Sequence, residues 1–274
     1  MFPFRIALNS STLRPFNLNV VEQLKIASEA GYEGIELWMA DIMSYLENGG
    51  STHALTEYMN DLGISCVNAI AFFRWSDRDG IQREAALDQA RKEMEILADL
   101  GCPAVAAPPF GDLEGLTFRE ISGYFARLYE IGRVTGVEPY LEFWGKAAHL
   151  SRISEAMLVL MESGVPNGKM LIDPFHMYTG GSSLDQLAYI NGASVGIVHV
   201  NDYPDGFDRK TIMDKDRLFP GEGVMPSKKF AELLNGIGYS GFLSLELFIE
   251  HFGDQSALEV AQYGLNQIKA AYAL

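Results

Sequence analysis

Short apolar stretches alternate with longer amphipathic stretches along the whole chain. The short ones are rich in apolar and β-branched residues, as is typical of strands buried on both faces. Between them, apolar residues recur at helical spacing, for example Leu87, Ala90, Met94 and Leu97. The pattern predicts eight strands, at Arg5–Asn9, Gly34–Trp38, Ile64–Ile70, Ala104–Pro109, Tyr140–Trp144, Met170–Asp173, Ile197–Asp202 and Phe242–Leu247.

Helix start and stop signals divide the chain in the same way. Three capping boxes, which satisfy free N–H groups at a helix start, begin at Asn19, Thr117 and Ser256, each with a glutamate three residues later. Glycines follow seven helical stretches and suit the positive φ that often ends a helix. They are Gly31, Gly63, Gly101, Gly136, Gly164, Gly192 and Gly238.

The strand ends, at residues 9, 38, 70, 109, 143, 173, 200 and 247, are regularly spaced except for the long last interval. Eight such units over about 250 residues predict a single (β/α)8 barrel domain spanning residues 1–274. A doubly wound open sheet is the alternative, but no GxGxxG follows the first strand and no GxxxxGK[ST] occurs. No Pro- or Gly-rich linker divides the chain. Because active sites lie at the strand C-termini of such barrels, the long interval after residue 200 is a candidate functional loop.

Composition narrows the classes of protein. Of 274 residues, 48% are hydrophobic, enough for a large core. No stretch of about 18 apolar residues predicts a membrane span, and the start Met1-Phe2-Pro3-Phe4-Arg5 lacks the pattern of a secretion signal. Two cysteines without a CxxC pair exclude a disulfide framework, so we expect a cytoplasmic protein. The net charge of −15 disfavours a nucleic-acid partner.

Four ionisable residues stand at the C-terminal ends of four consecutive predicted strands: Glu142, Asp173, His199 and Glu246. Each has apolar neighbours, so a lone charge at any of these positions would be costly. Individually, each could be a structural group paired to a lysine or to the backbone. Together, three carboxylates and one imidazole at one end of a barrel predict a divalent metal site.

The donor types indicate which metal is expected. Three carboxylates and one imidazole without a thiolate form a mostly hard oxygen site, which favours Mn²⁺ and also accepts Mg²⁺, Co²⁺ or Zn²⁺. No HExxH or Cys/His spacing offers a competing site.

Four further residues are candidate substrate contacts. His176 follows Asp173 by three residues and is either a ligand for a substrate hydroxyl or a surface histidine. Arg217, in the long loop, is expected either to orient a polyol or to form a salt bridge with Asp214 or Asp216. Trp38 is expected either to be an ordinary core residue or to belong to an apolar rim that covers the C–H face of a sugar-like ligand. Lys146 adds positive charge at the mouth or is solvated surface.

Hydrolytic alternatives explain fewer residues. No GxSxG motif is present, and neither cysteine has a basic neighbour in sequence. Glu142 and Glu246 could form the acid and nucleophile of a glycosidase. Asp173 and His199 would then have no task, whereas metal chemistry uses all four residues.

The chain resembles the xylose-isomerase-like sugar isomerase/epimerase superfamily, and within it the inosose (2-keto-myo-inositol) isomerases of inositol catabolism. The resemblance covers essentially the whole chain. It rests on Leu-Glu142-Phe, Ile-Asp173-Pro-Phe-His176, Val-His199-Val-Asn-Asp202, Asp216-Arg217-x-x-Pro-Gly-x-Gly223 and Leu-Glu246-Leu, with the stretches Leu8–Leu13 and Val67–Phe73.

This resemblance implies a TIM barrel with one divalent metal at Glu142, Asp173, His199 and Glu246. It implies that Glu142 and Glu246 transfer protons and that His176 and Arg217 lie near substrate oxygens. It also adds Asn68 to the expected substrate contacts and makes a homo-oligomer unsurprising. Lys146, Pro174 and Met177 depart from the pattern of inosose isomerases, which leaves the substrate open.

We therefore expect a metal-dependent isomerase or epimerase of a keto-polyol or ketose, acting through an enediolate. A lyase or dehydratase on the same kind of substrate is one alternative, and a non-catalytic metal-containing sugar-binding barrel is another. An apurinic endonuclease is disfavoured by only five histidines and by the acidic charge.

Overall fold

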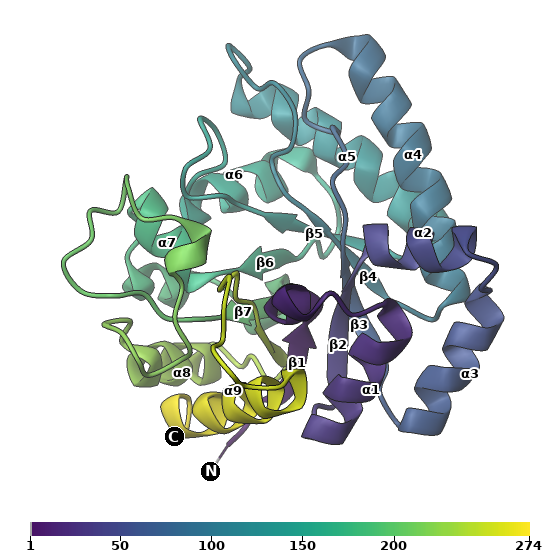
Figure 1. Ribbon diagram of the computed structural model, residues 1–274. Helices are drawn as coiled ribbons and strands as arrows, with labels where there is room; N and C mark the ends of the chain where they lie inside the picture. The colour runs from purple at the N-terminus through teal and green to yellow at the C-terminus, as the bar shows by residue number, and fades with distance from the viewer. Residues whose placement is uncertain (1) are drawn as a thin grey trace.

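Eight parallel strands close into a barrel in the computed structural model, which describes residues 2–274 (Figure 1). Each strand pairs with the next in sequence, and β8 pairs with β1. The strands are β1 (Arg5–Asn9), β2 (Gly34–Trp38), β3 (Ser65–Ile70), β4 (Ala104–Ala107), β5 (Glu138–Glu142), β6 (Met170–Ile172), β7 (Val195–Val200) and β8 (Phe242–Leu245).

Helices surround this barrel and complete the predicted (β/α)8 fold, which is confirmed. They are α1 (Val20–Ala30), α2 (Met39–Glu47), α3 (Thr52–Leu62), α4 (Gly80–Asp99), α5 (Phe118–Thr135), α6 (Ile153–Ser163), α7 (Pro174–Gly180), α8 (Ser227–Gly236) and α9 (Ala257–Ala271). Short 3-10 helices add η1 (Ser10–Phe16), η2 (Leu184–Tyr189), η3 (Gly192–Ser194) and η4 (Asp214–Asp216).

The C-terminal ends of several strands lie earlier than the apolar pattern predicts. β5 ends at Glu142 and β7 at Val200, whereas their apolar stretches continue into the loops that follow. β5 also begins earlier than predicted, at Glu138 rather than Tyr140, and so includes Pro139. A proline is tolerated near the start of a strand. Apolar character marks burial, and the loops at this end of the barrel are themselves buried.

All three predicted capping boxes are present, at Asn19, Thr117 and Ser256. The prediction for Gly192 is wrong, because this glycine lies in η3 and has no positive φ. A Cβ at Gly192 would lie 2.6 Å from the Gly238 carbonyl carbon, so close backbone approach is the physical reason for the glycine.

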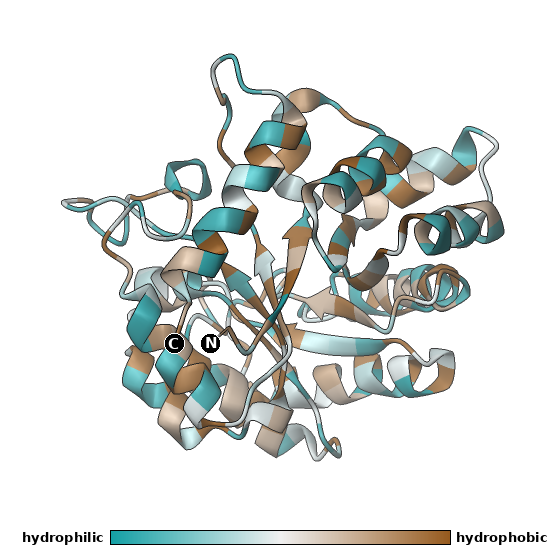
Figure 2. Ribbon diagram, turned by 90° about the horizontal axis from the view of Figure 1, so that it is seen from below, coloured by the Kyte–Doolittle hydropathy of each residue, from teal (hydrophilic) through white to brown (hydrophobic). Residues whose placement is uncertain are grey.

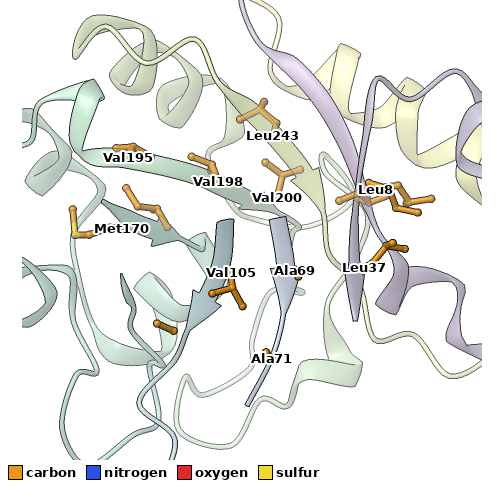
Figure 3. Close-up of a cluster of buried hydrophobic side chains, with 14 of the residues drawn as sticks. Leu8, Leu37, Ala69, Ala71, Val105, Met170, Val195, Val198, Val200 and Leu243 are labelled. Atoms are coloured by element: carbon orange, nitrogen blue, oxygen red, sulfur yellow. The ribbon is translucent and has the colours of Figure 1, made fainter. Parts of the chain in front are cut away.

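Side chains alternate between the outside and the inside of the barrel along each strand. The outward ones pack against the helices in the main core, and Figure 3 shows several of them, including Leu8, Val105, Val198 and Leu243. The inward ones form a separate small apolar cluster that includes Ala106, Tyr140, Leu171 and Ile197. Above this cluster the inward positions become polar, which prepares the site described below.

Hydropathy follows this arrangement. In Figure 2 the central strands carry mostly apolar residues, whereas the surrounding helices mix apolar and polar ones. None of the helices within residues 2–274 combines the length and apolar character needed to cross a bilayer. Two predictions include Met1: the single domain over residues 1–274 and the lack of a secretion signal at the N-terminus. Met1 lies outside the described residues. The domain boundary stays a prediction.

Candidate metal and substrate site

Asp173, His199 and Glu246 meet at the C-terminal end of the barrel. Each offers a donor atom within 4.8 Å of the donors of the other two, and all three residues are buried. His199 is an inward residue of β7, Glu246 directly follows β8, and Asp173 directly follows β6. Asp173 also caps α7, because its carboxylate accepts a hydrogen bond from the Phe175 amide and Pro174 occupies the first helical position.

Glu142, the fourth predicted ligand, ends β5 and lines the adjoining cavity without joining the three-residue cluster. Its Oε1 lies 3.7 Å from Nε2 of His176. Burial raises the pKa of the Glu142 carboxyl to about 8; the charge of His199 opposes this rise, while the Glu246 and Asp173 carboxylates reinforce it. A carboxyl in this environment is suited to carrying a proton near neutral pH.

Arg217 reaches the cluster from the loop between β7 and α8. One guanidinium nitrogen lies 2.8 Å from Asp173 Oδ2 and 2.7 Å from Glu246 Oε2, and another lies 2.6 Å from Asp214. Arg217 therefore forms the expected salt bridge with Asp214 and also lines the adjoining cavity, while its contact with a polyol stays a prediction. Although burial disfavours its charge, these three carboxylates raise the pKa of Arg217. Arg217 and the histidines hold the pKa of the Asp173 carboxyl well below its usual value despite burial.

Glu36 is the site residue that the sequence analysis missed. It lies fully buried on β2, and its Oε2 is 3.0 Å from Nε2 of His199. The signal was present, because Ile35-Glu36-Leu37 has the same apolar–Glu–apolar pattern as Leu245-Glu246-Leu247. Glu36 escaped notice because it stands two residues before the end of its strand rather than at the end.

Two asparagines donate hydrogen bonds to the carboxylates of Glu36 and Glu246. Asn9 donates to both Glu36 and Glu246, at 3.2 Å each. Asn68, expected to contact substrate, donates to Glu36 at 2.7 Å and does not line the cavity. Burial disfavours ionised Glu36, but His199 and hydrogen bonds, including that from Asn68, lower the pKa of its carboxyl overall.

The donor atoms of Asp173, His199 and Glu246 are suited to binding a divalent cation. His199 Nδ1 is buried, points toward Asp173 and Glu246, and makes no hydrogen bond of adequate geometry. A buried nitrogen without a hydrogen-bond partner is costly unless something binds it. Two carboxylates and an imidazole are common ligands of Zn²⁺ and Mn²⁺. The donor set therefore fits a metal at Asp173, His199 and Glu246, with Glu142 at the edge of the same site.

A cavity of about 630 Å³ adjoins this cluster; Glu246 lines it, whereas Asp173 and His199 are not among its lining residues. Glu142, Glu246, His176 and Arg217 line its polar side. His176 lies in α7 and is mostly buried, with a side chain 13% exposed, rather than in a surface loop; burial lowers its pKa. A group of aromatic side chains in mutual contact also lines the cavity, among them Trp38, Phe72, Trp144 and Phe248.

Trp38 and Lys146, both predicted to contact substrate, line this cavity. Each already interacts with other residues of the chain. The Trp38 indole donates to Asn9 and carries the Arg14 guanidinium 3.6 Å from its ring centroid. The Lys146 ammonium donates to the Ile212 carbonyl and so ties the loop after β5 to the loop after β7.

Asp202 fixes the loop that carries Arg217. Its carboxylate accepts hydrogen bonds from the amides of Tyr203, Gly221 and Met225, at 2.8, 3.0 and 2.8 Å. Its backbone also pairs with Leu218, the residue after Arg217. One buried aspartate thereby holds together segments up to 23 residues apart.

The sequence is similar to one protein family and to several named enzymes. A family model described as "Xylose isomerase-like TIM barrel" matches residues 24–271. An inosose isomerase of Halalkalibacterium halodurans is 28% identical over 89% of this chain and 88% of its own length. A 3-dehydroshikimate dehydratase of Pseudomonas putida is 26% identical over 90% of this chain, which covers 39% of that protein.

Solved structures share the fold. A crystal structure described as the IolI protein with a bound zinc atom has a TM-score of 0.88 at 24% identity, covering 99% of this chain and 100% of the other. An L-ribulose 3-epimerase has a TM-score of 0.77 at 19% identity, covering 98% of this chain and 94% of the other.

Proposed function

Because the chain belongs to the xylose isomerase-like TIM barrel family, we propose that it is a metal-dependent isomerase or epimerase of a keto-polyol or ketose. The observation that carries the proposal is the cluster of Asp173, His199 and Glu246 beside a cavity that Glu246 lines together with other polar and aromatic side chains. Relatives named inosose isomerase, which align over 85–90% of the chain, support this reaction class.

A divalent cation held by Asp173, His199 and Glu246, with Glu142 at its edge, would polarise a substrate carbonyl and stabilise negative charge on its oxygen. The IolI structure contains zinc, whereas the oxygen-rich donor set of this chain favours manganese.

The chain's own residues then move the proton. One of the two glutamates, Glu142 or Glu246, takes the proton from the carbon next to the carbonyl, which produces an enediolate. The other returns it to a neighbouring carbon or to the opposite face of the same carbon. A positioned acid or base of this kind contributes typically ~10²–10⁴-fold to the rate. His176 and Arg217, on the same side of the cavity, are placed to bind substrate hydroxyl groups.

The aromatic wall favours a cyclic or sugar-like substrate. Rings such as Trp38 and Phe72 offer apolar faces to C–H groups, while other lining residues offer hydrogen-bonding groups. A keto-polyol has both kinds of surface. An inosose meets this description, and it is the substrate class named in the curated relatives.

A second candidate is a dehydratase, which the 3-dehydroshikimate dehydratase relatives favour. The first step is the same removal of a proton next to a carbonyl. The electron pair then expels a hydroxyl group from the next carbon, and the leaving oxygen takes up a proton to give water.

The test incubates the purified protein with inososes and ketohexoses in D₂O and follows the products by NMR. We expect an isomerised product with deuterium at the reacting carbon, and loss of turnover after chelation that returns when Mn²⁺ or Zn²⁺ is added. An alkene product with release of water would favour the dehydratase. Binding without turnover across the panel would favour a non-catalytic barrel, and turnover unaffected by chelation would contradict the metal-dependent proposal.

Several earlier expectations stay predictions: manganese as the metal, a cytoplasmic location, a homo-oligomer, and the absence of nucleic-acid and membrane partners. The roles of Asn68, Lys146 and Trp38 as substrate contacts also stay predictions.

A further inference from the structure

The fully buried carboxylate of Glu36 contacts the imidazole of His199, which belongs to the cluster of Asp173, His199 and Glu246. The two residues come from β2 and β7, which are not hydrogen-bonded neighbours, and meet across the barrel interior. The His199 Nε2 atom lies 3.0 Å from one Glu36 oxygen and 3.3 Å from the other. The imidazole is therefore held at Nε2 by Glu36 and faces Asp173 and Glu246 with Nδ1.

Strand register keeps the Glu36 carboxylate in place. Asn9 pairs with Glu36 in the β1–β2 ladder, and Glu36 pairs with Asn68 in the β2–β3 ladder. Both asparagine side chains donate to the Glu36 carboxylate, one to each oxygen. Such bonds limit the carboxylate to one orientation, the one that contacts His199.

A structural role alone does not account for this arrangement. Within the described part of the chain, His199 is the ion-pair partner of Glu36, and no lysine or arginine bridges to it. Burying an ionised carboxylate costs more free energy than burying an apolar side chain of similar size. This cost has an explanation if the Glu36 carboxylate orients the imidazole of His199.

Building on the metal site of the proposed function, we propose that Glu36 is a positioning residue for that site. Glu36 accepts the Nε2–H of His199, which fixes the tautomer and the ring orientation and directs the Nδ1 lone pair toward the cation. Carboxylates that orient a metal-ligating histidine in this way typically contribute 10- to 100-fold to metal affinity.

The test compares zinc binding by the full-length metal-free protein and its E36Q variant, measured by competition with a chromogenic chelator. Glutamine has nearly the shape of glutamate but lacks its charge, so we expect zinc affinity to fall by about 10- to 100-fold. The matched control is E138Q, since Glu138 is also a strand glutamate in an ion pair, with Lys169, but lies at the opposite end of the barrel. We expect E138Q to bind zinc like the unaltered protein.

A second measurement does not depend on the variant folding. In the zinc-loaded unaltered protein, ¹⁵N spectra of the histidine rings report which nitrogen of His199 carries the proton, with the H199Q spectrum identifying its signals. We expect a proton on Nε2 and zinc on Nδ1.

The outcomes separate the two proposals. Failure of the unaltered protein to bind zinc or manganese would overturn the metal site and the proposed function with it. Zinc binding by the unaltered protein that E36Q leaves within twofold would overturn the role of Glu36 and leave the proposed function standing. Zinc on Nε2 of His199 would overturn it as well.

Discussion

Single inward-facing residues decide what this barrel can do. Asn9, Glu36, Asn68 and His199 are polar residues that lie buried in the barrel interior. Buried polar groups usually have hydrogen-bond partners, and the side chains of Asn9, Asn68 and His199 all contact the Glu36 carboxylate. This polar layer gives the cluster its fixed geometry.

At this scale, E246Q is the sharpest test of proton transfer. An amide cannot take a proton from carbon, and it is a poorer ligand for a cation. We expect kcat to fall by roughly 10²–10⁴-fold while the circular dichroism spectrum stays unchanged. The control is E250Q, because Glu250 is exposed in the segment that follows β8. Near-normal turnover by E246Q would remove Glu246 from the mechanism.

At the scale of elements, the segment between β7 and α8 is the part of the site that is least tied to the strands. Arg217 reaches Asp173 and Glu246 from this segment, and its position depends on the hydrogen bonds that Asp202 accepts from backbone amides. A hydrogen bond to a charged group contributes about 1.5–3 kcal/mol to stability, more than a bond between neutral groups.

The variant D202N tests this dependence. The asparagine amide keeps one acceptor oxygen but turns an N–H group toward a backbone N–H, so the segment should loosen. We expect a loss of about 1–3 kcal/mol in unfolding free energy and a lower kcat, measured by urea denaturation and by turnover. D205N is the control, since Asp205 lies exposed in the same segment and accepts from the Gly206 amide alone. If D202N matches D205N in both measurements, Asp202 does not position Arg217.

At the scale of the whole molecule, the cluster joins strands β6, β7 and β8 at one end of a closed barrel. A cation there would bind the folded state alone, because the unfolded chain does not bring Asp173, His199 and Glu246 together. Binding therefore adds to the stability of the entire fold.

We expect zinc or manganese, added to the metal-free protein at 100 times the dissociation constant, to stabilise folding by about 2.7 kcal/mol. For a chain of this size that corresponds to a Tm increase of roughly 5 °C, measured by calorimetry. The D173N/H199Q double variant should show no increase. An unchanged Tm in the unaltered protein at saturating metal would contradict binding at this site.

The sequence by itself determined the local order of the molecule. Its apolar periodicity indicated eight strand–helix units, the capping boxes marked helix starts, and strand-end positions singled out Glu142, Asp173, His199 and Glu246, because each of these signals depends on near neighbours along the chain. The structure brings the last three together, and Glu142 lines the adjoining cavity. Only the tertiary structure decided which distant residues meet. Glu36 contacts His199 across 163 positions of sequence, and Gly192 is required by the backbone near Gly238 rather than by a helix end. Closure of the barrel brings such residues together, and periodicity carries no record of contacts across its interior.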